Sequence, residues 1–292
     1  MSFNRLFFVL CLIATLGLVA AGCGDDDDDS SDSGSEETAS VSSEDCTPDQ
    51  LDTVAPDTLT IATDDPAFPP YFEDNDPTNG EGFESAVAYA IAEELGFSED
   101  QVTWVVEPFN RSYAPGPKEY DFDINQISIT PKRAEAVDFS SPYYEAKQAV
   151  VALKDSPAAD ATTLADVADA DIGVQIGTTS LDAVETVIQP TSDAQVFDTS
   201  NDVVSALKNE QVDAVVVDVP TAFFLTAVQV TDATIVGQFA GPEGDEFGAL
   251  LEKDSPLTAC VSAAIDSLSE SGELAEIEEQ WLSEATDAPI LE

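Results

Sequence analysis

The apolar residues after about residue 50 alternate between strand-like and helix-like patterns. Residues 59–63 form a short apolar run, as expected for a buried strand. In the next segment, apolar side chains recur every four residues, at Phe83, Val87, Ile91 and Leu95. That spacing places them on one face of a helix, and Gly96 is a natural helix end.

The same alternation continues to the C-terminus. Further strands are predicted at residues 102–106, 123–129, 171–177, 194–197 and 213–218. Helices are predicted from Pro131, at residues 180–188 and 201–209, and twice after residues 247–253. The alternation restarts after residues 141–155, which favours two α/β lobes, each with a parallel sheet covered by helices.

The N-terminus predicts export from the cytoplasm. Residues 6–21 form an apolar run of sixteen, short of the roughly 20 that span a bilayer, so residues 1–22 read as a signal peptide. The run ends in AAGC, which resembles a bacterial lipobox with Cys23 as the lipidated residue. Residues 23–45 are acidic and poor in apolar residues, so we expect a disordered tether. The hypothesis is a lipoprotein on the outer face of the membrane; a cleaved signal with an incidental cysteine is the alternative.

The cysteines favour the same compartment. Cys11 lies in the signal peptide and Cys23 takes the lipid, which leaves Cys46 and Cys260. An even remainder outside the cytoplasm predicts a disulfide. Two free thiols are the alternative.

Charge and composition exclude several functions. The chain has nine Lys and Arg against 59 Asp and Glu, a net charge of −50, which disfavours nucleic acid and anionic membrane surfaces as partners. It has no histidine, so a Ser-His-Asp or Cys-His arrangement and a His-ligated zinc cannot form. Nucleotide-binding glycine motifs and calcium-loop spacing are also absent. We expect no cofactor and no metal.

Two of the few cations lie in an unfavourable place. Lys132 and Arg133 fall in the first turn of a helix that Thr130 would cap and Pro131 would begin. The helix dipole disfavours cations there by about 0.3–1 kcal/mol. A carboxylate docked at this helix start, beside Ser128, would accept backbone N–H bonds and a bidentate arginine. Arg133 is therefore a candidate carboxylate ligand, and a plain exposed arginine is the alternative.

Other polar residues follow the carboxyl ends of strands, where α/β sheets bind ligands. These residues are Asp64, Asp65, residues 177–179 and Asp218. Asp218 is a candidate to bind an ammonium group; the alternative is that it caps the N-terminus of the helix that follows. Phe68 and Phe109 would sandwich a side chain, or else belong to the core. Carboxylate, ammonium and a side chain between aromatic rings describe an amino acid.

Six segments together resemble one family. They are TDDPAFPPYF, GFESAVAYAIAEELGF, DFDINQISITPKRAEAVDFSSPYY, IGVQIGTTS, VDAVVVDVPTA and SGELAEIEEQWL. Over about residues 55–285 the chain resembles the solute-binding proteins of polar amino-acid ABC importers, in the type II periplasmic binding protein superfamily. The resemblance implies two α/β lobes joined by a two-strand hinge, with the ligand in the cleft. The expected boundaries are 46–146 for the first part of lobe 1, 147–240 for lobe 2, and 241–292 for the return to lobe 1 with the C-terminal helices.

The resemblance also implies a role for each candidate residue. Arg133, Ser128 and Thr179 would bind the α-carboxylate, and Asp218 and the backbone carbonyl of Gln126 would bind the α-ammonium group. Phe68, Phe109 and Gln175 would contact the ligand side chain. The acid of the pocket would be Asp64 or Asp65, since TDDPAF is one residue longer than the usual segment. Arg111 lies in a segment that differs from the family, either at the surface or at the pocket rim.

The implied function is that of an importer's substrate-binding component. A monomer would capture a polar amino acid, with a basic one favoured, by closing its lobes about hinges near residues 144–150 and 237–246. It would then deliver the ligand to a membrane permease, with no enzymatic activity. The alternative is a periplasmic cyclohexadienyl-type dehydratase on the same fold, with Asp64 or Asp65 as general acid. A sensor domain and a purely structural lipoprotein are further alternatives.

Overall fold

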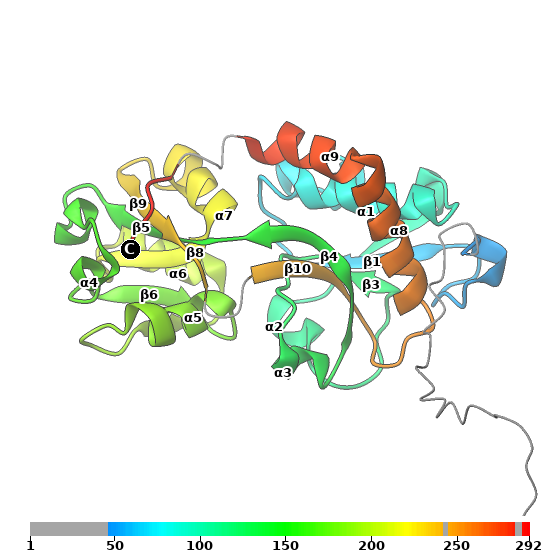
Figure 1. The fold of residues 1–292 in the computed structure, drawn as a ribbon, viewed down its shortest axis with the longest axis horizontal. Coiled ribbons are helices and arrows are strands. Elements are labelled where there is room, and N and C mark those ends of the chain that lie inside the picture. Colours follow the sequence, from blue (N-terminus) through cyan, green and yellow to red (C-terminus); the bar gives the residue numbers. More distant parts are fainter. Residues whose placement is uncertain (1–45, 242–244, 284–287) are drawn as a thin grey trace, which may run out of the picture. The chain divides into compact units, whose positions relative to one another are not determined.

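The computed structural model describes residues 46–241, 245–283 and 288–292, which form two five-stranded sheets (Figure 1). The first sheet has the order β2-β1-β3-β10-β4 and the second β7-β6-β8-β5-β9. The strands of the first are β1 (Leu59–Thr63), β2 (Val102–Val106), β3 (Phe122–Asp123), β4 (Asp138–Ala146) and β10 (Asp245–Leu251). The predicted signal peptide (1–22), the predicted lipidation site Cys23 and the predicted tether (23–45) lie outside the described residues.

The second sheet contains β5 (Gln148–Leu153), β6 (Ile172–Gln175), β7 (Gln195–Phe197), β8 (Ala214–Asp218) and β9 (Ala233–Phe239). The predicted parallel pairing is confirmed for β1 with β2 and β3, and for β6 with β7 and β8. It is wrong for β4 with β10, and for β5 with β8 and β9, which are antiparallel. The physical reason is that β4 and β5 lead out of the first lobe into the second, whereas β9 and β10 lead back, so outgoing and returning strands run in opposite directions.

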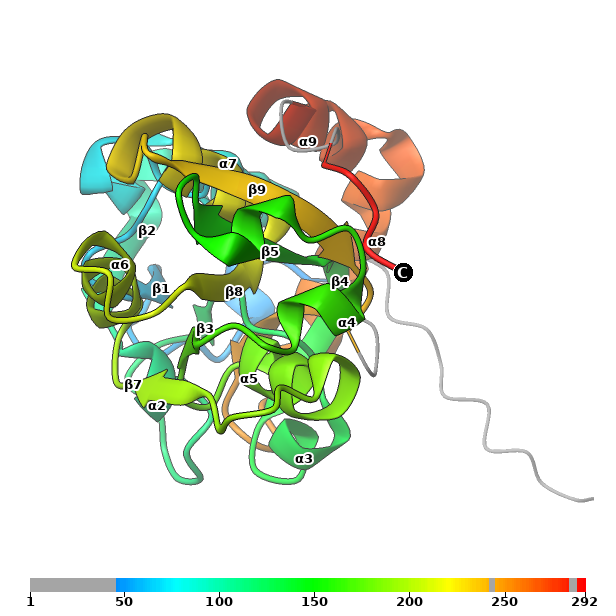
Figure 2. The ribbon, with the colours of Figure 1, turned by 90° about the vertical axis from the view of Figure 1, so that its left-hand side faces the viewer.

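Helices lie around both sheets (Figures 1 and 2). They are α1 (Phe83–Glu94), α2 (Phe109–Ser112), α3 (Pro131–Ala134), α4 (Leu164–Val167), α5 (Thr179–Ala183), α6 (Ser200–Lys208), α7 (Val219–Phe224), α8 (Thr258–Ser271) and α9 (Glu273–Leu282). Two of them, α5 and α7, continue into π-helical turns at Val184–Ile188 and Leu225–Gln229. Within the described ranges, no helix is long and apolar enough to cross a membrane.

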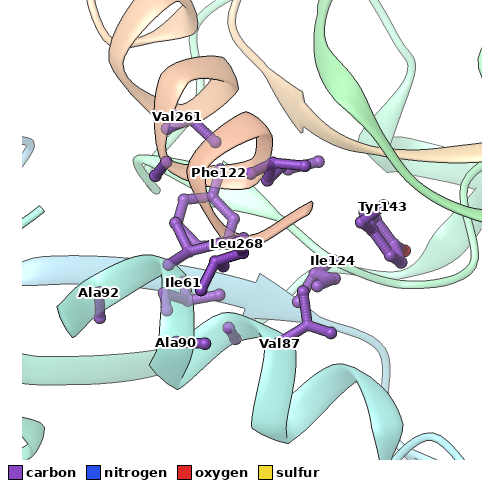
Figure 3. Close-up of a cluster of buried hydrophobic side chains, with 14 of the residues drawn as sticks. Ile61, Val87, Ala90, Ala92, Phe122, Ile124, Tyr143, Val261 and Leu268 are labelled. Carbon is purple, nitrogen blue, oxygen red and sulfur yellow. The ribbon is translucent and has the colours of Figure 1, made fainter. Parts of the chain in front are cut away.

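The core of the first lobe lies between α1, α8 and the sheet. The predicted apolar face of α1 is fully buried, and the backbone of Gly96 (φ +80°) terminates the helix as expected. Figure 3 shows side chains of this cluster, with Val87 from α1, Leu268 from α8 and Ile61 from β1 among them. Burial of each large apolar side chain contributes about 1.5–3 kcal/mol to folding.

The sheet of the second lobe is buried on both faces. Val150 and Ala152 of β5 belong to one apolar cluster, whereas Ala149 and Val151 belong to the cluster on the other face. Alternating side chains of a strand point to opposite faces. A strand with both sets apolar is therefore covered by helices on two sides, as the continuous apolar run in its sequence indicates.

The disulfide predicted between Cys46 and Cys260 is confirmed, with Cα atoms 5.6 Å apart. Cys46 is buried, and Cys260 on α8 packs against the same core of the first lobe. The bond therefore fixes the start of the described chain to the helix layer of that lobe.

Residues 288–292 lie on the second sheet, which corrects the assignment of 241–292 to the first lobe. The backbone N–H of Gln238 in β9 donates to Pro289 O at 2.6 Å, and Leu291 N donates to Gln238 O at 2.9 Å. The Leu291 side chain is buried in the apolar core of the second lobe. Because β9 is an edge strand, it has backbone groups free to pair with this segment. The chain thus passes between the lobes three times.

Candidate functional site

One cavity of about 420 Å³ lies between the two lobes. Its lining includes every ligand-binding residue predicted from the sequence: Asp64, Asp65, Phe68, Phe109, Gln126, Ser128, Arg133, Gln175, Thr179 and Asp218. The tertiary structure therefore gathers on one surface residues that are up to 154 positions apart, from Asp64 to Asp218 (218 − 64).

Arg133 is a buried cation at the start of α3. The Thr130 hydroxyl accepts a hydrogen bond from Arg133 N at 3.2 Å, so the predicted N-cap is confirmed. The guanidinium donates from Nη1 to Ser128 O at 2.6 Å and from Nη2 to Gly177 O at 2.9 Å. Burial lowers the Arg133 pKa from its ordinary value. Among the described residues, no carboxylate lies within ion-pair distance of it.

Aromatic rings fix the orientation of this guanidinium. Its central carbon lies 5.5 Å from the ring centre of Phe109 and 5.0 Å from that of Tyr113. Such cation–π contacts contribute about 0.5–2 kcal/mol each. The Tyr113 ring can lie this close to the backbone at position 177 because that residue is glycine. A Cβ at Gly177 would lie 2.3 Å from the Tyr113 hydroxyl oxygen. Two hydrogen bonds and two aromatic rings thus fix the position of the guanidinium. The neighbouring Lys132 is exposed, as predicted.

Two hydroxyl groups from different lobes meet beside Arg133. The Ser128 and Thr179 side-chain oxygens are 3.2 Å apart, and Ser128 is buried. Both can donate a hydrogen bond to an anion bound at the guanidinium. Arg133 and these hydroxyls therefore place donors from both lobes around one point, an arrangement that suits a carboxylate.

Asp218 lies at the end of β8, in the N-cap position of α7, but its side chain makes no capping hydrogen bond. The N-cap alternative is therefore wrong for the side chain. Instead, Asp218 Oδ1 accepts from Gln148 Nε2 at 2.9 Å, and the same nitrogen donates to Asp245 at 2.8 Å. Burial and the Asp245 charge raise the Asp218 pKa to about 7, against the effect of the Gln148 hydrogen bond. This carboxyl has only a neutral amide as its hydrogen-bond partner among the described side chains.

The strand predicted at residues 123–129 is shorter than expected. Regular pairing ends at Asp123, and Gln126 adopts a left-handed conformation with φ +48°. A left-handed residue turns the chain out of the extended ladder, which ends the strand. Only an isolated bridge, from Ser128 to Phe247, follows. This turn brings Gln126 to the wall of the cavity.

The two acids after β1 differ in environment. Asp64 is half-buried, and its oxygens accept from Phe109 N at 3.2 Å and from Asp65 N at 2.8 Å. Asp65 is exposed, and its carboxylate accepts a long contact of 3.4 Å from Asn75. Both line the cavity, with Asp64 the more buried of the two.

Of the remaining candidate residues, three line the cavity and one lies at the surface. Phe68 and Phe109 are half-buried and line the cavity, whereas Gln175 accepts a hydrogen bond from Ser200 at 2.6 Å. Arg111 is a surface residue, because its side chain is 74% exposed and pairs with Glu107 at 3.4 Å. It therefore adds no positive charge to the lining.

Sequence reasoning missed several polar residues of the lining, of which Asn110, Asn125 and Asp198 bear most on the site. Asn110 donates to the backbone oxygen of Asp198 at 3.2 Å, a contact from one lobe to the other. Asn125 is buried, and its side-chain nitrogen has no hydrogen-bond partner in the described part of the chain. Asp198 follows a predicted strand, so the strand-end rule applied to Asp64 would have found it. No comparable signal marks Asn125.

The lining is strongly acidic. Its charged residues within the described ranges are Asp64, Asp65, Asp198, Asp218 and Arg133. A cleft lined by one sign of charge concentrates ligands of the opposite sign. No group of three or more Cys, Asp or Glu side chains suited to a metal occurs in the described residues. The arrangement therefore suits an organic ligand with one anionic and more than one cationic group.

Comparisons with known proteins agree with this geometry. The family model described as "Bacterial extracellular solute-binding proteins, family 3" matches residues 59–284. The arginine-binding extracellular protein ArtP of Bacillus subtilis (strain 168) is 26% identical over 217 residues, 73% of this chain and 82% of ArtP. The solved structure of an ancestral arginine-binding protein bound to glutamine has a TM-score of 0.65 and 30% identity, over 77% of this chain and 97% of that one. An ancestral amino acid-binding protein, described as a precursor of cyclohexadienyl dehydratase, has a TM-score of 0.62 and 26% identity, over 77% and 94%.

Proposed function

Because the chain belongs to the bacterial extracellular solute-binding proteins of family 3, we propose that it captures an amino acid with a cationic side chain for an ABC importer. The amino acid binds in the cavity between the lobes and is delivered to a membrane permease. The protein acts by binding and release, without chemical change of the ligand.

The observation that carries this proposal is a pair of incompletely paired charges on one cavity. Arg133 is buried without a carboxylate partner, and Asp218 is hydrogen-bonded only by a neutral amide among the described side chains. A buried charge without a counter-charge is costly. The α-carboxylate and α-ammonium groups of an amino acid supply both counter-charges at once.

The remaining acids of the lining favour a basic side chain. With Asp218 assigned to the α-ammonium group, Asp64, Asp65 and Asp198 have no cationic partner among the described lining residues. The flat surfaces of Phe68 and Phe109 suit an aliphatic stem or a guanidinium group. ArtP is named for arginine, and the ancestral protein holds glutamine, so a long polar side chain is accommodated by relatives of this fold.

The other site residues complete the proposed clamp. Ser128 from the first lobe and Thr179 from the second support the carboxylate, and the Gln126 carbonyl receives the ammonium group. Gln175 contacts the side chain of the bound amino acid. Since the two lobes contribute together, the full set of contacts exists only in the closed state, and binding selects that state.

We also infer how the protein is held at the cell surface. A signal peptide at residues 1–22 exports the chain, a lipid on Cys23 anchors it, and residues 23–45 act as the tether. The body works as a monomer outside the cytoplasm. Labelling of cells with a fatty-acid probe tests this, because the label is lost in Cys23→Ser if the lipid is attached there.

Calorimetric titration of the soluble body, from Asp45 onward, tests the function. We expect one or a few basic amino acids to bind. Arg133→Ala should weaken binding by about 2–5 kcal/mol, because a desolvated carboxylate loses its partner. Lys132→Ala is the matched control, since that side chain is exposed at the adjacent position.

A loss of less than threefold in Arg133→Ala would contradict the assignment of the clamp. If none of the standard amino acids binds, the proposed ligand class is wrong. Prephenate and arogenate, with dehydration followed by ultraviolet absorbance, then test the dehydratase alternative.

A further inference from the structure

Glu84 is a fully buried carboxyl next to the cavity that the clamp does not use. It lies in the first turn of α1 with a side chain that is 0% exposed. In the described part of the chain no Lys or Arg forms an ion pair with it. A buried carboxyl without a cationic partner needs a strong set of hydrogen-bond donors.

Three donors converge on this carboxyl. The backbone N–H of Gln126 donates to Oε1 at 2.6 Å, and the Gln126 side-chain amide donates to Oε2. The third donor is the Tyr143 hydroxyl, on the crossing strand β4, which donates to Oε1 at 2.5 Å. Two of the three bonds therefore hold one residue, and that residue lines the cavity.

Gln126 requires this support because of its backbone conformation. Its φ of +48° is in the left-handed region, which side chains with a Cβ rarely occupy. Such a conformation costs about 1–2 kcal/mol relative to the right-handed one. Bonds from both nitrogens of Gln126 to a single carboxylate offset that cost and restrict the rotation of the residue.

The same bonds decide what Gln126 can offer a ligand. Its backbone N–H and its side-chain NH₂ are both directed to Glu84. The main-chain polar atom that remains is the carbonyl oxygen, an acceptor; the side chain keeps its acceptor oxygen and the second N–H of its amide. The backbone of Gln126 therefore has only an acceptor left for the cavity, which suits an ammonium group.

We propose that Glu84 is a positioning residue for ligand recognition, which holds Gln126 in its left-handed conformation so that Gln126 presents its backbone carbonyl oxygen to the α-ammonium group. This inference rests on the proposed function for the identity of the ligand. The attachment of Gln126 to Glu84 is a separate claim about the protein alone, and each can be measured without the other.

The test compares Glu84→Gln with the wild-type body. Hydrogen exchange of the Gln126 amide in the ligand-free protein reports the attachment directly. Calorimetry with L-arginine and with its des-amino analogue, 5-guanidinovalerate, reports ammonium recognition. Glu93→Gln is the matched control, because it makes the same substitution at an exposed position of α1.

In Glu84→Gln we expect faster exchange at Gln126 and a loss of arginine affinity of about tenfold or more, since hydrogen bonds to a charged group are lost. The analogue, which has no α-ammonium group, should lose less than threefold. Glu93→Gln should match the wild type in all three measurements.

A rescue experiment separates positioning from a general structural role. Glycine adopts a positive φ without support. Gln126→Gly combined with Glu84→Gln should therefore regain most of the arginine affinity, and the double variant serves if Glu84→Gln alone does not fold. Unchanged exchange at Gln126 in Glu84→Gln, equal losses for both ligands, or no rescue would each overturn the proposal. If the wild type binds no amino acid, the proposed function fails, and the exchange measurement still decides whether Glu84 holds Gln126.

Discussion

Residues of opposite charge lie close together in and beside the cavity. Among the described residues, the Arg133 guanidinium donates to two carbonyl oxygens and lies over two aromatic rings. Asp218 and Glu84 lie nearby, and burial raises the pKa of each to about 7. We therefore expect the protonation of both carboxyl groups to change near neutral pH, and stability and binding to change with it.

Raising the pH should change the stability of the protein and its affinity for the ligand in opposite directions. The pKa of Asp218 rises from 3.8 to about 7 on folding, and that of Glu84 from 4.5 to about 7, so the folded state binds more protons between about pH 4 and pH 7. The free energy of unfolding of the ligand-free protein therefore falls as pH rises through that window. Ligand affinity should instead rise with pH, since an ammonium group binds the ionised Asp218.

Calorimetric titration at pH 6 and pH 8 measures how ligand affinity depends on pH. We expect arginine affinity about tenfold lower at pH 6, where most of Asp218 is protonated and must release its proton on binding. Asp218→Asn should bind weakly and show a flatter profile between these two pH values. A wild-type affinity that is constant from pH 6 to pH 8 would contradict the assignment of Asp218.

At the scale of elements, local pattern predicted some features and failed at others for a clear reason. The helix α1 was predicted from a four-residue repeat, and α3 from Thr130 and Pro131, because short-range spacing and caps govern helices. The strand predicted at residues 123–129 was too long, because nothing in its apolar pattern indicates that the chain turns at Gln126. That turn depends on Glu84, which is 42 residues away.

The C-terminal residues 288–292 are the element that sequence reasoning misplaced. Leu291 is 4% exposed in the core of the second lobe, whereas Ile290 beside it is 71% exposed. Leu291→Ala should lower the free energy of unfolding by about 2 kcal/mol or more, from lost burial and a cavity. Ile290→Ala, the control, should change it by less than about 0.5 kcal/mol. Urea unfolding of both variants measures this, and equal effects would contradict the placement of the segment.

At the scale of the whole molecule, the net charge of −50 opposes compaction, and covalent and apolar links oppose that repulsion. The chain passes between the lobes three times, and Cys46–Cys260 closes a loop with a sequence separation of 214. A crosslink over so long a loop removes much of the conformational entropy of the unfolded chain.

Replacement of Cys46 and Cys260 together by Ser should lower the free energy of unfolding by about 5 kcal/mol in the chain-entropy model. Denaturant unfolding in the presence and absence of a thiol reductant measures the loss. The reductant should destabilise the wild-type body and leave the double variant unchanged. Equal stability of the oxidised and reduced wild type would refute a stabilising role for the bond.

The sequence by itself determined the periodic helices, the pairing of the two remaining cysteines, and the candidate residues that line the cavity, since these follow from short-range spacing, composition and motif. Only the tertiary structure decided that Arg133 has no acidic partner in the described part of the chain, that the Asp218 side chain leaves its helix uncapped, that Glu84 holds Gln126, and that Leu291 joins the second lobe. The physical reason is the same for all four. Each depends on contacts, made or absent, between groups far apart in the chain, and burial rather than local pattern determines which of these groups meet.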